Sequence, residues 1–236
     1  RLRIEPNDGQ RRDVREVPGL DLVLGPCSAS VRAAIEETAR AAGATVSMAE
    51  DDREADEWLH HATIGLAGAH QRENARIAYV LGRRTGASPE ACARGIATVE
   101  WPGRLETLLA GDTTVLLDAA HNPDGAKALA AFLAPRDPSA TALVFGTLAD
   151  KAWPEMLDAL APRAAERFYV TPKGRAATDP RDMAARHPGA VVETVAEAYE
   201  RARRSADYVV ACGSINVIGE LRALLLDLPR DPPIAL

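Results

Sequence analysis

Short apolar runs alternate with amphipathic segments along most of the chain, and this alternation predicts an α/β protein. The pattern is most regular after residue 105, where several apolar runs, such as Ala142–Phe145, are unbroken. Unbroken runs are typical of parallel strands that are buried on both faces. The predicted strands are Thr114–Asp118, Ala142–Gly146, Arg167–Thr171, Ala190–Glu193 and Tyr208–Cys212, and the predicted helices begin near Pro123, Trp153, Pro180, Val195 and Ser214. We therefore predict a doubly wound, Rossmann-like domain over residues 105–236.

The start of the chain is less regular. Residues 1–19 are polar and charged without periodicity, which is typical of a tail or a connecting segment. Two apolar runs, Asp21–Leu24 and Thr45–Met48, flank an amphipathic stretch at residues 30–42 that Gly43 is expected to end. This order predicts one β-α-β unit.

Two further helices are predicted before residue 100. One covers His70–Arg84, and the other runs from Pro89 to about Ala97, with Ser88 as its N-cap. The acidic residues 50–57 are interpreted as an exposed loop. Residues 101–104, Trp-Pro-Gly-Arg, break the helical pattern and are interpreted as a hinge between two domains.

Composition, net charge and the absence of long apolar runs argue against several classes of protein. The chain has 236 residues, 47% of them hydrophobic and 26% charged, so it can bury a core and is not a disordered or collagen-like polymer. Its net charge of −6 argues against a protein that binds nucleic acid. No apolar run approaches the ~18 residues of a membrane span and no leader opens the chain, so we expect a cytoplasmic protein that does not contact a membrane. The widely spaced Cys27, Cys92 and Cys212 predict reduced, buried thiols rather than disulfides or a zinc site.

Polar residues follow four of the predicted strands. Because ligands bind beyond the carboxyl ends of parallel strands, these residues are expected to share one edge of the sheet. They include a carboxylate, an imidazole, two lysines, an arginine and a Gly-Ser turn, which suit a phosphate-bearing ligand and a carboxylate substrate. Each segment alone also fits an ordinary strand-to-helix turn. The segments are Asp118–Gly125, Gly146–Lys151, Thr171–Arg175 and Cys212–Asn216.

Two motifs carry a family resemblance. Trp-Pro-Gly-Arg-Leu-Glu at 101–106 and Asp-Ala-Ala-His-Asn-Pro at 118–123 resemble the C-terminal half of folylpolyglutamate synthase/dihydrofolate synthase, the folate branch of the Mur ligase superfamily. The resemblance extends from about residue 25 to 225. It implies that residues 1–100 are the end of a P-loop ATPase domain and residues 105–236 the glutamate-ligase domain. Four further segments agree in order: 70–75, 145–151, 172–176 and 212–220.

The resemblance implies an ATP-dependent ligase that adds glutamate to folate or dihydropteroate. In such enzymes a substrate carboxylate attacks the γ-phosphate to form an acyl phosphate, and the amine of glutamate then displaces phosphate. Catalysis of this kind depends on positioning and charge stabilisation rather than on a covalent nucleophile. The partners implied are ATP, Mg²⁺, L-glutamate and the folate or dihydropteroate acceptor, bound by a monomer.

Three residues match the family's ATP-contacting positions. Asn74 is expected near the base, Arg104 at the phosphates and Asp118 at the ribose hydroxyls, and an arginine fork fits two phosphate oxygens at once. The residues alone leave alternatives open, since Arg104 also fits a surface ion pair and Asn74 a helix-surface amide.

Three more residues match positions for chemistry and for the incoming amino acid. His121 is expected to orient the acyl phosphate or the amino acid and, with Lys151, forms the catalytic pair that the resemblance implies. Lys151 and Ser214 resemble the positions that hold the carboxylates of the amino acid.

The sequence lacks one part of the family pattern. All three lysines lie at or after position 127, so no phosphate-binding loop of the form G-x-x-x-x-G-K-[S/T] occurs in the first hundred residues. The family's magnesium ligands belong to the same missing stretch, and no metal site is predicted in this sequence. We favour a piece of a longer ligase over half of a split enzyme, with the loop on a partner chain, or a remnant that binds nucleotide or folate without turnover.

Other function classes remain as alternatives. Another Mur-family amino-acid ligase is the nearest of them. A dehydrogenase or methyltransferase is disfavoured, because no G-x-G-x-x-G follows the first strand after the hinge.

Overall fold

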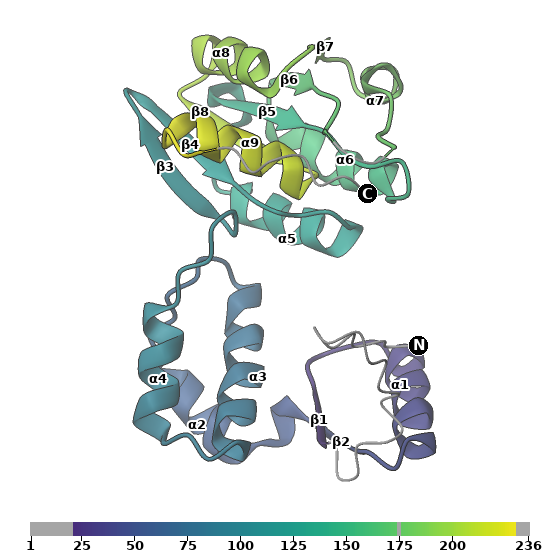
Figure 1. Cartoon of the computed structure of the whole chain (residues 1–236), viewed down its shortest axis with the longest axis vertical. Helices are drawn as coiled ribbons and strands as arrows, with labels where there is room; N and C mark the ends of the chain where they lie inside the picture. Colours follow the sequence, from purple (N-terminus) through teal and green to yellow (C-terminus); the bar gives the residue numbers. More distant parts are fainter. Residues whose placement is uncertain (1–20, 174–175, 230–236) are drawn as a thin grey trace. The chain divides into compact units, whose positions relative to one another are not determined.

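The computed structural model describes residues 21–173 and 176–229 (Figure 1). The predicted tail at 1–19 and the motif residues Gly174 and Arg175 lie outside the described residues. The chain divides into two compact units, one formed by residues 1–65 and 70–99 and the other by residues 66–69 and 100–236.

The first unit opens with the predicted β-α-β. Strands β1 (Asp21–Leu24) and β2 (Thr45–Met48) are parallel, and α1 (Ala29–Ala41) connects them. Gly43 follows α1 with a φ of 70°, the left-handed conformation that commonly ends a helix. The other elements of this unit are η2 (Ala49–Asp51), α2 (Arg53–His61), α3 (His70–Arg84) and α4 (Pro89–Thr98).

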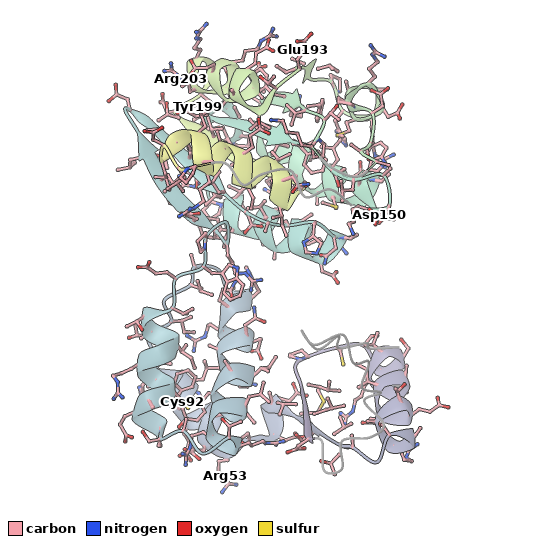
Figure 2. All side chains as sticks on the ribbon, viewed as in Figure 1. Arg53, Cys92, Asp150, Glu193, Tyr199 and Arg203 are labelled. Atoms are coloured by element: carbon pink, nitrogen blue, oxygen red, sulfur yellow. The ribbon has the colours of Figure 1, made fainter. Side chains whose placement is uncertain are left out.

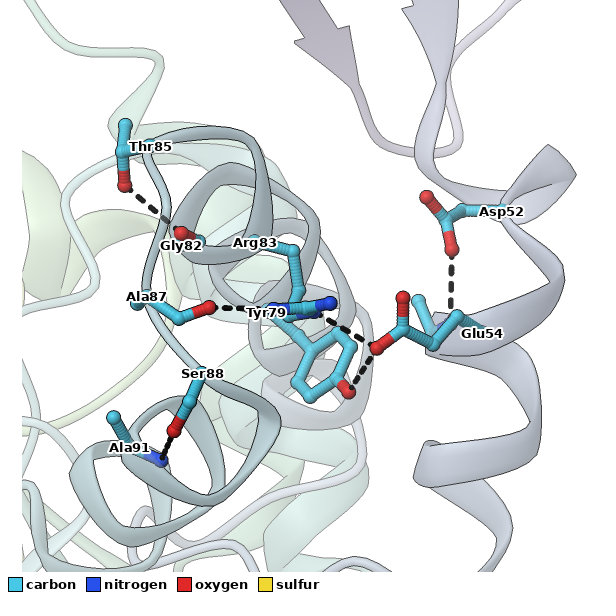
Figure 3. Close-up of polar contacts among 10 residues, drawn as sticks. Asp52, Glu54, Tyr79, Gly82, Arg83, Thr85, Ala87, Ser88 and Ala91 are labelled. Atoms are coloured by element: carbon cyan, nitrogen blue, oxygen red, sulfur yellow. Dashed lines mark hydrogen bonds and ion pairs between the residues drawn. The ribbon is translucent and has the colours of Figure 1, made fainter.

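The acidic segment at 50–57 is largely helical, so the predicted exposed loop is wrong. Asp52 caps α2 by accepting the amide of Ala55 at 2.9 Å. Glu54 Oε1 accepts hydrogen bonds from the Tyr79 hydroxyl at 2.9 Å and from Arg83 Nε at 2.8 Å (Figure 3). The acidic residues thus form the polar side of an amphipathic helix, and α3 supplies their partners.

Tyr79 of α3 lies in a small hydrophobic core of the first unit, where Trp58 of α2 packs against it. Burial raises the pKa of Tyr79 to about 12, so its phenol stays protonated and donates to the Glu54 carboxylate at neutral pH. The ring of Tyr79 stacks on Trp58 of α2 with centroids 4.4 Å apart. These contacts fix α3, the helix that carries Asn74, against α2.

Among the described residues, the second unit contains a six-stranded sheet in the order β3-β4-β8-β5-β6-β7. All neighbours are parallel except β3 and β4. The predicted α/β architecture is confirmed, and each predicted helix begins within one residue of its predicted start. The elements are β3 (Glu106–Ala110), β4 (Thr113–Leu117), α5 (Pro123–Leu133), η3 (Pro138–Ala140), β5 (Thr141–Phe145), α6 (Trp153–Leu160), η4 (Ala161–Arg163), β6 (Glu166–Tyr169), α7 (Pro180–Arg186), β7 (Ala190–Val191), α8 (Val195–Ser205), β8 (Tyr208–Cys212) and α9 (Ile215–Leu225).

Helices cover both faces of this sheet (Figure 1). Alternate strand residues point to opposite faces, so that Leu116 and Leu143 pack with α5, α6 and α7, while Val115 and Val144 pack with α8 and α9. The strand interiors are fully buried, which explains their unbroken apolar runs.

The sequence analysis missed strand β3. It forms a hairpin with β4 through Gly111, whose φ of 63° suits the tight turn. As an edge strand it alternates between half-buried and exposed residues, and Leu109 is 80% exposed. The unit is therefore a mixed sheet with one antiparallel edge. The predicted strand at 190–193 is reduced to two residues at the opposite edge.

Candidate functional site

The turns that follow the parallel strands are joined by backbone hydrogen bonds at one edge of the sheet. The Gly213 amide donates to the Ala120 carbonyl at 3.1 Å, which links the turns after β8 and β4. The Gly146 amide donates to the Cys212 carbonyl at 3.4 Å, which links the turns after β5 and β8. The expected proximity is therefore present for the turns after β4, β8 and β5.

The chain direction makes this edge suitable for ligands. After β4 the chain enters α5 on one face of the sheet, and after the neighbouring β8 it enters α9 on the other face. In open α/β sheets, ligands typically bind where neighbouring strands diverge in this way. Asp118, His121 and Ser214 lie in the turns that follow these two strands.

Close backbone approach requires glycine here. Gly213 has a φ of 98°, and a Cβ on it would lie 2.7 Å from the Gly146 carbonyl oxygen. A Cβ on Gly146 would lie 2.5 Å from the carbonyl oxygen of Val170. Both glycines let neighbouring turns pack without side chains between them.

In the Pro-Gly-Arg-Leu-Glu turn, the residues on either side of Arg104 have a left-handed backbone conformation. Gly103 has a φ of 70° and the buried Leu105 a φ of 48°. A left-handed conformation is unfavourable for leucine and persists only where the surroundings enforce it. The Leu105 side chain is 4% exposed and packs into the core beneath α5 and α6.

Asp118 holds this turn. Its Oδ2 accepts the Leu105 amide at 3.0 Å and its Oδ1 accepts the Ala120 amide at 2.9 Å. The residue is 8% exposed. Asp118 therefore connects the end of β4 to the turn that carries Arg104, a role that the sequence analysis did not assign to it.

Arg104 itself is exposed. Its guanidinium carbon lies 5.6 Å from the centroid of the Trp101 ring, a cation-π contact, and Trp101 is 61% exposed. No ion pair between described residues involves Arg104. The surface ion pair that was its alternative role is therefore absent from this part of the chain.

The contact of His121 fixes its tautomer. Nδ1 lies 2.9 Å from the carbonyl oxygen of Ala119, which can only accept, so Nδ1 carries the hydrogen. In the neutral imidazole Nε2 is then an acceptor. The ring is exposed and lies just before α5, whose N-cap is Asn122. This segment therefore caps a helix, as in an ordinary strand-to-helix turn, and also places an exposed imidazole after β4.

Lys151 and Ser214 lie on the other two turns. Lys151 Nζ is 3.4 Å from Asp150, which is labelled in Figure 2, and its side chain is 31% exposed. The loop before it is tied down by the Ala149 amide, which donates to the Ala176 carbonyl at 3.0 Å. Ser214 is buried and caps α9, with its hydroxyl oxygen accepting the Asn216 amide at 3.2 Å. Its hydroxyl hydrogen remains a donor.

Asn74 belongs to the first unit. Its Nδ2 donates to Gln71 Oε1 at 2.9 Å, and Gln71 Nε2 lies 2.9 Å from His70 Nε2. Gln71 is 1% exposed, so a buried amide orients the exposed Asn74. The sequence analysis cited segment 70–75 but assigned no role to Gln71, because a glutamine one turn before Asn74 does not by itself indicate a contact between the two side chains.

Cys212 ends β8 at this edge of the sheet, and it is buried. Burial raises the pKa of the Cys212 thiol at the end of β8 well above its usual value. Cys92 is also buried, but Cys27 is exposed, so the prediction of three buried thiols is wrong for that residue.

The searches for metal and membrane features cover residues 21–173 and 176–229. Within these ranges no group of three or more His, Cys, Asp or Glu side chains could hold a metal ion. No helix there has the length and apolar character needed to cross a membrane.

Comparison with known proteins shows that the segment containing these turns is similar to one domain family. Residues 103–215 match the model of the Mur ligase glutamate ligase domain. The chain is 36% identical over 177 residues to a probable bifunctional folylpolyglutamate synthase/dihydropteroate synthase of Halobacterium salinarum, which covers 71% of this chain and 22% of that protein. It is 30% identical over 177 residues to the dihydrofolate synthase/folylpolyglutamate synthase of Bacillus subtilis, which covers 68% of this chain and 40% of that protein.

The fold agrees with a solved member of the same group. A folylpolyglutamate synthase of Mycobacterium tuberculosis, complexed with ADP and AMPPCP, superimposes with a TM-score of 0.75 and 26% identity, over 90% of this chain and 56% of that chain. The chain thus spans about a fifth to two fifths of the two curated relatives named here.

Proposed function

Because residues 103–215 belong to the glutamate ligase domain family of the Mur ligases, we propose that the natural protein is an ATP-dependent ligase that adds glutamate to folate or dihydropteroate. The observation that carries the proposal is the convergence of the turns after β4, β8 and β5 on one edge, together with Arg104, which forms no ion pair with another described residue. The matched family and the folate-ligase relatives supply the reaction class.

Nucleotide recognition is assigned to Arg104, Asp118 and Asn74. Arg104 suits the phosphates, because its exposed guanidinium has no carboxylate partner among the described residues and can bind two oxygens in parallel. Asp118 is proposed to accept from the ribose while it holds the turn. Asn74 Oδ1, which accepts no hydrogen bond among the described residues, is proposed to face the base.

The remaining residues are assigned to the acceptor and the amino acid. ATP, as the substrate, supplies the phosphoryl group that turns the acceptor carboxylate into an acyl phosphate, which the amine of glutamate attacks with release of phosphate. His121 Nε2 is an acceptor suited to hold that amine, and Lys151 is suited to bind a carboxylate of glutamate. The Ser214 hydroxyl can donate to the same carboxylate.

Two parts of the proposed enzyme are not assigned to described residues. The motif G-x-x-x-x-G-K-[S/T] does not occur in these 236 residues, and no group of three or more His, Cys, Asp or Glu side chains among the described residues could hold a metal ion. Both are assigned to a further segment of the same natural protein, in preference to a partner chain.

The test is phosphate release by the natural protein purified from its source. Release is expected to require ATP, L-glutamate and folate or dihydropteroate together. Arg104→Ala and His121→Ala are each expected to lower turnover at least tenfold, about 1.4 kcal/mol of transition-state stabilisation, without unfolding the protein. Arg201→Ala is the matched control, because Arg201 lies on α8 in an exposed pair with Glu197.

Each outcome discriminates between function classes. Unchanged kinetics in both site variants would contradict the assignment. Release that requires a different amino acid or acceptor would identify another ligase of the Mur type. Nucleotide binding without any release would identify a binding protein.

A further inference from the structure

Glu106, like Asp118, accepts a backbone amide of the turn that carries Arg104. Its Oε2 accepts the Gly103 amide at 2.7 Å, although Glu106 itself is the first residue of β3. The side chain is 18% exposed. The amide before Arg104 and the amide after it, on Gly103 and Leu105, are therefore each held by a carboxylate.

Helix α9 supplies the partner of Glu106. Arg222 Nε lies 2.9 Å from Oε1 and 3.0 Å from Oε2 of Glu106, and its side chain is 27% exposed. A charge-assisted contact of this kind, partly shielded from water, is stronger than an exposed ion pair. Because it joins residues 116 positions apart, it fastens the end of α9 to the turn.

The same helix also packs against the turn. A Cβ on Gly103 would lie 2.5 Å from Ile218 Cδ1, so α9 meets the backbone of Gly103 directly. Ile218 lies one helical turn before Arg222, and the two therefore share a face of α9. The first turn of that helix is capped by Ser214. One rigid element thus carries a residue assigned to glutamate at its start and the support of Arg104 further along.

We propose that the Arg222–Glu106 ion pair is the positioning element for Arg104. It fixes the left-handed turn at Gly103–Leu105 and so directs the guanidinium toward the nucleotide phosphates. Arg222 and Glu106 act through this turn and touch no substrate. The inference rests on the proposed function, because it assigns the nucleotide to Arg104.

The test measures nucleotide affinity in the natural protein by isothermal titration calorimetry with a non-hydrolysable ATP analogue. Arg222→Met removes the charge and leaves an aliphatic chain of similar length. Glu106→Gln keeps an oxygen that can accept the Gly103 amide and removes the charge. Each variant is expected to raise the Kd at least about fivefold, and the double variant no more than the worse single variant, because the two residues act as one unit. Arg201→Met on α8 is the matched control and is expected to leave the Kd unchanged.

Amide hydrogen exchange at Gly103 and Leu105 provides a second measurement, which needs no ligand. Exchange is expected to accelerate in Arg222→Met at these two amides. A merely structural pair would lower Tm and leave the Kd of the folded protein unchanged. If Arg222→Met does not fold, Glu106→Gln decides the question.

The outcomes separate this inference from the proposed function. A Kd within twofold of wild type in both variants, with wild-type protein binding the analogue, would overturn the inference and leave the proposed function standing. Wild-type protein that binds no analogue would overturn both.

Discussion

Replacing Asp118 with asparagine probes the contact that holds the central turn. The wild-type carboxylate accepts two backbone amides, from Leu105 at 3.0 Å and from Ala120 at 2.9 Å. Asparagine offers one carbonyl oxygen and one NH₂ group, so one amide loses its acceptor and faces a donor instead. Both amides belong to buried residues, at 4% and 6% exposure, where water does not readily replace the lost partner.

The expected cost is about 2 kcal/mol, since an unsatisfied buried donor costs about 1–3 kcal/mol. For a unit of this size that corresponds to a fall in Tm of about 4–8 °C. The left-handed Leu105 adds to the effect, because it relies on the lost contact to keep its φ of 48°.

Differential scanning calorimetry is the assay, because it resolves the transitions of two units that need not unfold together. Asp112→Asn is the matched control, an identical chemical change at an exposed hairpin residue. A Tm for Asp118→Asn within about 1 °C of the control would refute the view that this carboxylate holds the turn.

Two further predictions concern the same unit. Gly103→Ala is expected to lower the free energy of unfolding by about 1–3 kcal/mol, because φ is 70° and the new Cβ would meet Ile218. Adding Ile218→Ala would relieve the contact but not the backbone strain. An unchanged Tm in a thermal melt of Gly103→Ala would contradict this prediction. Arg186 and then His187 hold the pKa of the Asp158 carboxyl well below its usual range, so its stabilisation is present above the unfolded-state pKa of about 4 and is lost as the pH falls below it. In thermal melts from pH 7 to 3, the free energy of unfolding of wild type should exceed that of Asp158→Asn by at most about 1 kcal/mol, because this ion pair is exposed. The difference should narrow as the pH falls. A difference that widens in acid would contradict the prediction.

The helices of the second unit were predictable because their starts are marked locally. Pro123, Trp153, Pro180 and Val195 each begin a helix, and Asn122 and Thr194 cap two of these helices through side-chain oxygens. Such signals depend on neighbouring residues alone. Helix α2 escaped prediction for the opposite reason: Glu54 looks like part of a solvated acidic run until Tyr79 and Arg83, far along the chain, are placed beside it.

The sequence pattern predicts where the candidate site lies, but not the contacts that hold the turn carrying Arg104. Because ligands bind at the carboxyl ends of parallel strands, the sequence pattern alone predicts Asp118, His121 and Ser214 at one edge of the sheet. The left-handed Leu105 had no local signal, because leucine favours other conformations, and its support comes from Asp118 thirteen residues later. The Arg222–Glu106 pair joins residues too distant for sequence spacing to reveal.

The most direct test of the account is the mass of the pterin product. The natural protein would be incubated with ATP, L-glutamate and either dihydropteroate or folate, and the pterin analysed by mass spectrometry. We expect the acceptor to gain one glutamyl residue, with one ADP formed for each glutamate added, and no gain when ATP is omitted. An acceptor of unchanged mass, with or without ATP hydrolysis, would contradict the assignment of this chain to a folate ligase.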